Sequence, residues 1–499
     1  MVRALAAVER ADVCVILIDA SVGITEQDTR VAGISHNAGK ACIIAINKWD
    51  LVKNVETHTF EQKLENEGRL CHVKTEVDPY HELGGIAAKL EGGKVVQFDK
   101  VKGSEYPVVT GLWWNRDNLG CVFDCDKEKL SFLFSDAVGS LRSNPVLPVV
   151  VDEAPVHYET MPEPDLTKIP VPTHALLDGG PYFSNGIIIA KDPETGVRNT
   201  SIHRMMVTGK NRISVLMDYG RHLRNYYERA EAMGKSLEIT INIGVHPAYY
   251  VAAITPSAAC PMEMDELAVA SYLLGEPARL CKSKTVDVEG IADAQMILEA
   301  EILPNVREPE GPFGEVTGYY ASREDRWVIN VKSISMSKDP IVHMLHPGRE
   351  VWNSVGLGVE ANVFQTLSRQ LPGVKKVYMT HGGSHYGLVV QMDPPKNGMA
   401  KNAILAAFAA FPPLQMVRVV NSDVNIYDPE ALERAMVTRC DPSKDVIIIP
   451  GAFCHELNPT VVDNIGSKIG FDCTYPVPKP ARYEMVSYQE VDLKDYVIE

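Results

Sequence analysis

Two glutamates, Glu310 and Glu315, close either end of the segment EGPFGE. A proline removes a backbone donor and glycines permit unusual dihedral angles, so the segment predicts a tight, fixed loop that is neither helix nor strand. When two carboxylates share one cation unequally, the less compensated one can have a raised pKa and donate a proton near neutral pH. The segment therefore predicts either an acid–base site or two solvated loop ends.

Four further residues could complete such a site: Asn199, Arg204, His222 and Glu266. The Arg204 guanidinium can bind a substrate carboxylate through two bonds while it keeps one glutamate ionised. The amide, imidazole and carboxylate of the other three suit a hard divalent cation that bridges to a phosphate. Residue type alone leaves three alternatives open: a structural ion pair at Arg204, a surface histidine at His222 and a helix-start glutamate at Glu266.

The elements that would position these residues lie in a strand-rich region, residues 175–330. The segments typical of strands are YFSNGIIIAKD, TSIHRMMVTG, RISVLMD, LEITINIG, ARLCKSK, AQMILEAEIL, VTGYYAS and WVINVKSIS. Two predicted helices interrupt them, GRHLRNYYERAEAMG and MDELAVASYLLG, and each places its candidate ligand near a helix start, where the dipole favours an anion. Many short strands with two helices predict a β-barrel-like core.

Asn199 and Arg204 are five residues apart on one predicted strand. Successive side chains of a regular strand alternate between its two faces, so an odd separation places these two side chains on opposite faces. This arrangement would let Asn199 serve the metal end of a site and Arg204 the substrate end.

The flanking regions predict an α/β (α+β) fold with three domains. Residues 55–150 alternate helix and strand, which indicates an N-terminal α/β domain. Residues 151–174 are rich in proline and acids with little periodicity, which marks a connector. Residues 331–499 return to strand and helix alternation. We therefore expect domains at 55–150, 151–330 and 331–499, preceded by a separate segment at 1–54.

The first 54 residues predict half of a parallel α/β unit. VCVILIDA (13–20) has the pattern of a buried strand, a helix is expected to end at Gly39, and ACIIAINKWD (41–50) is a second apolar strand. The N-K-x-D turn that follows can offer Asn47 and Asp50 to the edge of guanine, with the Lys48 stem on the base. This stretch resembles the back half of the second G domain in the EngA/Der-type GTPases.

The rest of a GTPase site is missing from the sequence. No G-x-x-x-x-G-K-[ST] motif occurs, and a D-x-x-G element would be expected upstream of Met1. Without ligands for phosphate and magnesium, the fragment should not hydrolyse GTP. We interpret it as an inert remnant, a fusion or a misplaced start, with a guanine-nucleotide switch as the alternative.

Composition excludes several classes of protein. The chain has 499 residues, 45% hydrophobic and 23% charged, with a formal net charge of -16, which is typical of a globular protein and argues against a general nucleic-acid binder. The ten cysteines are scattered without paired CxxC motifs, so neither a disulfide framework nor a structural zinc site is indicated. No apolar run approaches ~18 residues and no signal-peptide pattern opens the chain, so a cytoplasmic protein without membrane partners is expected.

From about Phe60 to Asp472 the sequence resembles the UbiD-type decarboxylases, which use prenylated FMN. The matching landmarks, in register, are LENEGRLCHVKTEVDP, NTSIHRM, INIGVHPAYYVAA, EGPFGEVTGYY, VNSDVNIYDP and GSKIGFDCT. The resemblance implies a split β-barrel that binds the flavin at 151–330. It also implies an oligomerisation domain at 331–499.

The resemblance also implies residue roles. Arg204 matches the catalytic arginine, Glu310 the glutamate that pairs with it, and Glu315 the acid that returns a proton to carbon. The residues that match the metal site, usually manganese or magnesium held against the flavin phosphate with potassium commonly nearby, are Asn199, His222 and Glu266. The remaining expected cofactor contacts are Ser201, Ile202, Arg204 and Lys401, with Lys396 as an alternative to Lys401.

The implied activity is reversible, non-oxidative decarboxylation of an aromatic, heteroaromatic or α,β-unsaturated carboxylic acid. Loss of carbon dioxide leaves an electron pair that no side chain can delocalise, so an organic cofactor is required. A flavin prenyltransferase would supply it, and the chain would form a homodimer or a hexamer. The alternative is a flavin-binding protein of the same fold without this chemistry.

Overall fold

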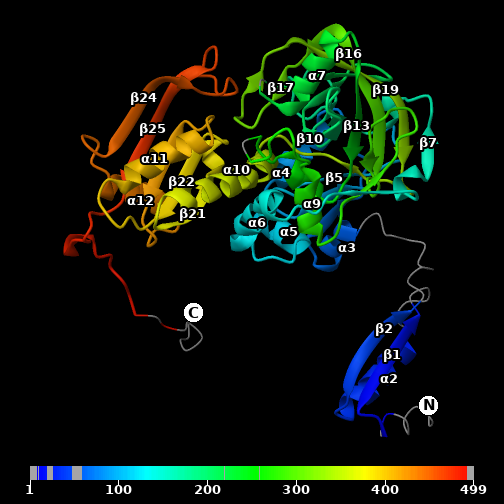
Figure 1. Ribbon diagram of the computed structural model, residues 1–499, viewed down its shortest axis with the longest axis horizontal. Coiled ribbons are helices and arrows are strands. Elements are labelled where there is room, and N and C mark those ends of the chain that lie inside the picture. Colours follow the sequence, from blue (N-terminus) through cyan, green and yellow to red (C-terminus); the bar gives the residue numbers. More distant parts are fainter. Residues whose placement is uncertain are drawn as a thin grey trace. The chain divides into compact units, whose positions relative to one another are not determined.

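The computed structural model describes residues 8, 10–19, 26–47, 59–218, 220–257, 259–489 and 491. The chain divides into two compact units, Met1–Thr59 and Phe60–Glu499 (Figure 1). None of the described helices is long and apolar enough to cross a lipid bilayer.

The first unit contains a strand, a helix and a second strand. β1 (Val13–Asp19) pairs in parallel with β2 (Ala41–Asn47), and α2 (Glu26–Asn37) connects them. Parallel neighbours need a long crossover connection, which α2 provides. The predicted half of a parallel α/β unit is therefore confirmed as local structure. Within the NKWD turn, Lys48 and Asp50 lie outside the described residues.

The second unit begins with a small sheet whose strand order is β20-β5-β4-β3. Its strands are β3 (Leu70–Val73), β4 (Val95–Phe98), β5 (Val108–Thr110) and β20 (Val342–His343). The helices around it are α3 (Thr59–Asn66), α4 (Glu82–Leu90), α5 (Arg116–Val122) and α6 (Leu130–Ser143). Because β20 comes from far along the chain, this sheet ties the N-terminal region to the segment that follows the central sheet.

The central region is dominated by a nine-stranded antiparallel sheet in the order β10-β9-β13-β16-β19-β12-β11-β8, with β7 paired to β19. Its strands are β7 (Glu159–Met161), β8 (Tyr182–Phe183), β9 (Ile187–Lys191), β10 (Arg198–Ile202), β11 (Met205–Val207), β12 (Arg212–Val215), β13 (Leu237–Ile243), β16 (Met296–Glu310) and β19 (Glu324–Met336). Alternating residues of β9 enter different cores: Ile187 and Ile189 pack into one, Ile188 and Ala190 into another. Both faces of the sheet are therefore covered, as the predicted strand-rich core requires.

Smaller elements accompany this sheet. The helices are α7 (His222–Ala232), α8 (Pro247–Ala253) and α9 (Leu267–Leu274), and the short strands are β6 (Val149–Val151), β14 (Arg279–Cys281), β15 (Gly290–Ile291), β17 (Phe313–Gly314) and β18 (Tyr320–Ala321). The two helices predicted here, α7 and α9, are confirmed, whereas α8 was not predicted. Short 3-10 helices occur at η2 (Lys127–Lys129), η3 (Pro155–His157), η4 (Leu166–Lys168), η5 (His381–Gly383) and η6 (Ala481–Tyr483).

The C-terminal region is a five-stranded mixed sheet in the order β21-β22-β23-β25-β24. Its strands are β21 (Val374–Met379), β22 (Gly387–Met392), β23 (Met416–Val420), β24 (Val446–Phe453) and β25 (Ile465–Cys473), and its helices are α10 (Arg349–Gln370), α11 (Met399–Ala410) and α12 (Pro429–Arg439). Leu388 and Val390 of β22 pack with α10 and α11, while Val389 packs with α12. Helices thus cover both faces of the parallel core, as expected for an α/β region (Figure 1).

The mixed α/β fold predicted from the sequence is therefore present, with antiparallel strands concentrated in the middle of the chain. The boundary expected at residue 330 falls inside β19, a single strand. The domain limits stay predictions.

Candidate active site and metal centre

Arg204 lies between two strands rather than on one. β10 ends at Ile202 and β11 begins at Met205. The chain changes partners here, because β10 pairs with β9 while β11 pairs with β12 and β8. The expectation of one regular strand through Asn199 and Arg204 was wrong, because the strand ends between them. The alternation of side chains along a strand therefore does not determine which way these two side chains point.

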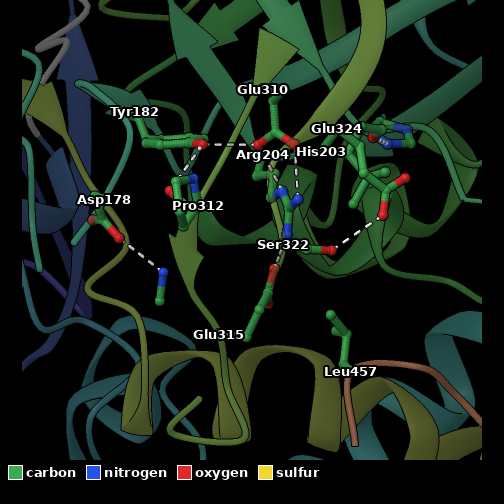
Figure 2. A network of polar contacts seen from close by, with 12 residues as sticks. Asp178, Tyr182, His203, Arg204, Glu310, Pro312, Glu315, Ser322, Glu324 and Leu457 are labelled. Atoms are coloured by element: carbon green, nitrogen blue, oxygen red, sulfur yellow. Dashed lines mark hydrogen bonds and ion pairs between the residues drawn. The ribbon is translucent and has the colours of Figure 1, made fainter. Parts of the chain in front are cut away.

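The Arg204 guanidinium contacts both glutamates of EGPFGE. Its Nε donates to Oε1 of Glu310 at 2.9 Å and its Nη2 to Oε2 of Glu310 at 2.7 Å. Its Nη1 donates to Oε1 of Glu315. Figure 2 shows the guanidinium between the two carboxylates. The side chains of Arg204, Glu310 and Glu315 are 9%, 0% and 14% exposed, so the three charges meet largely away from water.

The EGPFGE segment is more regular than predicted. Glu310 is the last residue of β16, and Phe313 and Gly314 form β17, which pairs with β18. Glu315 opens the turn back to β18, where its amide donates to the carbonyl of Tyr319. The expectation of a segment without strand was therefore wrong at Glu310, where pairing with β19 continues, and at Phe313 and Gly314, which pair with β18.

Gly311 explains why the chain can turn between the acids. Its φ is 90°, a region that favours glycine, and a Cβ there would lie 2.8 Å from the backbone oxygen of Ser322. Gly311 thus allows the chain to turn at the end of β16. This turn brings Glu315 to Arg204, which Glu310 already binds.

Tyr182 and Asp178 also brace the acid site, and sequence reasoning missed both. The Tyr182 hydroxyl donates to Oε1 of Glu310 at 2.8 Å. The amide of Gly314 donates to Oδ1 of Asp178 at 2.8 Å (Figure 2). Their signal in the sequence is the stretch DGGPYF, whose glycines and proline mark a turn at a strand start. Nothing in that stretch predicts that its residues bind Glu310 and Gly314.

Burial and charge act in opposite directions on the pKa values of Glu315 and Arg204. It raises the pKa of Glu315, and the charge of Arg204 lowers that pKa without cancelling the shift. Burial alone would lower the pKa of Arg204, but the charges of Glu315 and Glu310 hold it above its usual range. A guanidinium that stays charged beside a glutamate that binds its proton tightly is the arrangement expected of a cation with a neighbouring general acid.

The predicted metal ligands form a second cluster. Asn199 lies on β10, His222 begins α7, and Glu266 is the N-cap residue of α9. The Asn199 Nδ2 donates to Oε1 of Glu266 at 2.8 Å, and Nδ1 of His222 lies 3.5 Å from the same oxygen. The Thr200 amide donates to Oε2 of Glu266 at 2.9 Å. The structure therefore brings the three predicted ligands together.

The chemistry of this cluster fits a divalent cation. Oδ1 of Asn199 is buried and has no hydrogen-bond partner, and neither has the buried hydroxyl of Tyr226. Burial raises the pKa of Glu266, although His222, Thr200 and Asn199 lower it in part. Glu266 is buried and accepts bonds from an amide side chain and a backbone N–H, and the amide oxygen of Asn199 is unpartnered, so a hard cation on oxygen and imidazole ligands would supply positive charge here.

The other predicted cofactor contacts are placed differently. Ser201 and Ile202 end β10, and Oγ of Ser201 lies 3.1 Å from Nε2 of His203. Lys401 lies on α11, where its amine donates to the backbone oxygen of Lys444. That contact belongs to the C-terminal sheet region, and Lys396 is exposed. The structure does not bring either lysine into contact with the Asn199 cluster.

Family comparisons match most of the second unit. Three UbiD models match in order: the 3-octaprenyl-4-hydroxybenzoate carboxy-lyase N-terminal domain at residues 61–137, the Rift-related domain at 149–350 and the C-terminal domain at 353–473. The chain belongs to the UbiD family. The UbiD family and its carboxy-lyase class, both predicted from the landmark motifs, are therefore confirmed. The matches begin at residue 61, so they give no support to the GTPase-like segment expected at residues 1–54.

Individual UbiD relatives align over most of their length. An anhydromevalonate phosphate decarboxylase from Methanothermobacter thermautotrophicus is 34% identical, over 84% of this chain and 97% of its own. The UbiD-class enzyme HmfF from Pelotomaculum thermopropionicum, solved in complex with FMN, is 38% identical with a TM-score of 0.84, over 88% of this chain and 100% of its own. An evolved dimeric form of HmfF was solved in complex with prenylated FMN.

A third UbiD relative differs in its substrate. The apo 3,4-dihydroxybenzoic acid decarboxylase of Klebsiella pneumoniae is 28% identical with a TM-score of 0.82, over 88% of this chain and 98% of its own. Prenylated FMN, the cofactor predicted from the sequence, is thus bound in the evolved HmfF form, whereas the acids named for the relatives differ from one relative to the next.

Proposed function

We propose that this protein is a prenylated-FMN-dependent decarboxylase that acts reversibly on an aromatic, heteroaromatic or α,β-unsaturated carboxylic acid. The observation that carries the proposal is one buried guanidinium, Arg204, held between Glu310 and Glu315. A second cluster, suited to a divalent cation, is formed by Asn199, His222 and Glu266. Membership of the UbiD family supports the same reaction.

Asn199, His222 and Glu266 would hold manganese or magnesium, and the cation would supply positive charge for the flavin phosphate. Ser201, Ile202 and Arg204 would line the cofactor. When bound, prenylated FMN supplies the electron sink that decarboxylation requires. We do not extend the role of a phosphate contact to Lys401, whose amine is already engaged in the C-terminal region.

Arg204 would orient the substrate carboxylate. A guanidinium has more N–H donors than its two glutamate partners use, so donors remain for the substrate. Planar, charge-assisted bonds fix the direction of the carbon–carboxylate bond as well as its position. The Tyr182 hydroxyl and the two Arg204 bonds occupy the oxygens of Glu310, which keep the guanidinium in place.

Glu315 would return the proton to the carbon that carbon dioxide leaves. It has a single bond from Arg204, whereas Glu310 has two and a third from Tyr182. Burial raises the pKa of Glu315, so this carboxyl group holds its proton further towards neutral pH than an ordinary glutamate. In the carboxylation direction the same group would accept that proton.

The test is made on protein co-expressed with a flavin prenyltransferase. We expect a bound flavin whose absorbance extends beyond that of ordinary oxidised FMN, release of carbon dioxide from at least one acid of a panel, and deuterium incorporation at the product carbon in deuterated buffer. If metal and flavin bind but no acid exchanges that proton, the alternative of a flavin-binding protein without decarboxylase chemistry is correct.

We also propose self-association through residues 331–499. β24 is an edge strand of the C-terminal sheet, and the exposed apolar side chains there and on α12 include Val437, Ile448 and Phe453. Exposed edge strands with apolar side chains are sites of association. Light scattering that gives a monomer mass at micromolar concentration would contradict this proposal.

For residues 1–54 we propose no nucleotide-dependent role, because the phosphate loop is missing from the sequence. GDP titrated into the full chain is expected to give no heat of binding. Saturable GDP binding would restore the alternative of a nucleotide switch.

A further inference from the structure

The backbone on both sides of Glu315 is held by side chains from elsewhere in the chain. Before it, the Gly314 amide donates to Oδ1 of Asp178 at 2.8 Å (Figure 2). After it, the carbonyl of Val316 accepts the indole N–H of Trp352 at 2.9 Å. Asp178 precedes β8 of the central sheet, whereas Trp352 lies in the first turn of α10. The second bond therefore connects the segment of the expected proton donor to a helix outside that sheet.

The Trp352 indole is packed against a second ring that restricts its orientation. The ring centroids of Trp352 and His381 lie 5.6 Å apart, with an interplanar angle of 26°. Nε2 of His381 in turn lies 3.0 Å from Oδ1 of Asn353, the residue after Trp352. An indole has one N–H donor, which lies in the ring plane. Stacking that restricts the plane therefore also restricts the direction of the bond to Val316.

The first turn of α10 is itself anchored to the N-terminal region. Oε1 of Glu350 accepts the Gly111 amide at 2.8 Å and the Trp113 amide at 3.2 Å. Its Oε2 accepts the Thr110 hydroxyl at 2.7 Å. Nδ2 of Asn353 donates to the carbonyl of Trp113 at 2.7 Å. Glu350 and Asn353 are both 1% exposed, so water does not compete for these bonds, and the indole between them in the sequence has a rigid support.

The position of Glu315 depends on the backbone around it, because Arg204 makes only a single bond to its carboxylate. Proton transfer needs the acid within hydrogen-bond reach of the carbon, and a misplacement of about 1 Å can lower a rate by about 10²-fold. Burial also raises the pKa of Glu315, so a carboxyl group that moved towards water would hold its proton less tightly. The reach and the acidity of the proton donor therefore depend on the same loop.

We propose that Trp352 is a positioning residue for proton transfer: it holds the carbonyl of Val316 and thereby keeps Glu315 at the place from which the proton is returned to carbon. The inference rests on the proposed decarboxylase function. It gives α10, together with its anchors in the N-terminal region, a part in the protonation step.

The test uses Trp352→Phe on protein loaded with prenylated FMN. Phenylalanine keeps an aromatic ring against His381 but has no N–H for Val316. We expect kcat to fall by about tenfold to 10²-fold while KM changes by less than about twofold, because the bond acts on the proton donor and not on substrate binding. We also expect the decline of kcat with rising pH to begin at lower pH, since Glu315 loses part of its burial and its pKa falls.

Matched variants separate this bond from the bulk of the ring. In Trp352→His, the imidazole Nε2 lies in a five-membered ring at the position that Nε1 occupies in the indole, so it can donate to the same carbonyl. This variant should recover part of kcat and return the pH profile towards that of the unaltered enzyme. If Trp352→Phe fails to fold, Trp352→Tyr takes its place, because it keeps a ring and lacks a donor at that position.

Trp327→Phe is the control for loss of an indole elsewhere. Trp327 lies on β19, where the guanidinium carbons of Arg224 and Arg307 lie 5.2 and 5.4 Å from its ring centroid. The substitution should lower stability and leave kcat and its pH profile unchanged.

Amide hydrogen exchange reports on the loop without turnover. The Glu315 amide donates to the carbonyl of Tyr319, and the Gly318 amide donates to the carbonyl of Glu315. We expect both amides to exchange about fivefold faster or more in Trp352→Phe than in the unaltered protein or in Trp327→Phe, because the loop opens locally.

Three results overturn the inference: an unchanged kcat and pH profile in Trp352→Phe, a raised KM with kcat unchanged, or no recovery in Trp352→His. If no acid is decarboxylated but the two loop amides exchange faster in Trp352→Phe, the proposed function fails and the positioning of Glu315 stands. If the unaltered enzyme decarboxylates an acid and Trp352→Phe does so equally well, the inference fails and the function stands.

Discussion

The acid site and the metal cluster are both built around a buried carboxylate, but only one of them is complete. At the acid site, Arg204 donates to Glu310 and Glu315, and Tyr182 adds a further bond. At the metal cluster, Glu266 accepts bonds from neutral donors, and Oδ1 of Asn199 has no partner. Protein groups alone can therefore hold the acid site in shape, whereas we expect a bound cation to complete the metal cluster.

The difference also separates the chemistry of the two carboxylates. Burial raises the pKa of both Glu315 and Glu266. At the acid site the charge of Arg204 lowers the pKa of Glu315 in part and so opposes the effect of burial. Glu315 can therefore both hold a proton and release it. At the metal cluster, hydrogen bonds from His222, Thr200 and Asn199 lower the pKa of Glu266 only in part, so the net shift favours a proton on Glu266, which we expect a bound cation to displace.

The largest expected effect comes from removing the cation of the acid site. Arg204→Ala leaves Glu310, which is fully buried, without its ion partner. We expect decarboxylation to fall by about 10³-fold or more, since an oriented charge in a dry site is lost. We also expect unfolding free energy to fall by about 3–5 kcal/mol, the usual result of leaving a buried charge unpaired. Carbon dioxide release and chemical denaturation measure these two effects.

Arg212→Ala is the matched control for this change. Arg212 pairs with Glu308 near the end of β16, and both side chains are about one third exposed. Removing it should change unfolding free energy by less than about 1 kcal/mol and leave turnover intact. Equal losses in both variants would mean that the Arg204 pair is an ordinary structural ion pair.

The next effect comes from the proton donor. Glu315→Gln keeps the shape of the side chain but cannot transfer its proton, so turnover should fall by about 10²–10⁴-fold. Substrate binding should change little. Measurements of kcat and KM, with deuterium incorporation at the product carbon, check this. Glu324→Gln is the control, since Glu324 bonds to Ser322 and Arg326 at the exposed end of β19. Turnover close to that of the unaltered enzyme would remove Glu315 from the mechanism.

The pH dependence follows from the raised pKa of Glu315. A proton donor is active while protonated, so decarboxylation should be full below this raised pKa and decline as pH rises through it. The decline should therefore lie above the pH range where an ordinary glutamate titrates. A pH profile of kcat that stays flat from acid to alkaline conditions would contradict the assignment.

Substitutions in the metal cluster should change metal affinity rather than the acid site. Glu266→Gln is expected to reduce Mn²⁺ affinity by about tenfold or more while Arg204 and its partners keep their arrangement. Asp265→Asn is the control, because the adjacent Asp265 pairs with Arg198 instead. Metal content after gel filtration and calorimetry with Mn²⁺ measure the effect. If Asp265→Asn loses as much metal as Glu266→Gln, the ligand assignment is wrong.

The metal-free protein should also show the pKa shift of Glu266 in its stability. A raised pKa means that the folded state binds this proton more tightly than the unfolded chain. Its contribution is therefore greatest below the ordinary glutamate pKa and is lost as pH rises towards the raised value. Glu266→Gln, or saturating Mn²⁺, should flatten this part of the stability profile. An unchanged profile in both cases would contradict the shift.

The smallest effect is expected at Tyr182. Tyr182→Phe removes the hydroxyl that donates to Glu310 but leaves both Arg204 bonds. A hydrogen bond to a charged group contributes about 1.5–3 kcal/mol, so a fall in kcat/KM of about tenfold is expected. Tyr320→Phe is the control, since its exposed hydroxyl only accepts the Leu177 amide. A larger loss than in Glu315→Gln would reverse the assigned order of importance.

The sequence was least informative where tertiary contacts decide local structure. α10 was not predicted because it is buried on several sides, with polar residues such as Ser354 and Glu360 fully inside, so it lacks the polar face that marks an ordinary helix. Lys401 was chosen as a possible phosphate contact by its place in a motif, but its helix packs into the C-terminal sheet. The break between β10 and β11 depends on which strands each of them pairs with.

The sequence by itself determined which groups this protein can use: the acids of EGPFGE, the arginine and asparagine of NTSIHR, and helix starts that carry a histidine and a glutamate. Residue chemistry and turn propensity are local properties, so they can be predicted directly from the sequence. The family resemblance predicted that Arg204 pairs with Glu310, 106 residues away, but only the tertiary structure showed that Tyr182 joins them. Sheet pairing brings such distant segments together, and no local pattern encodes which strands will be neighbours.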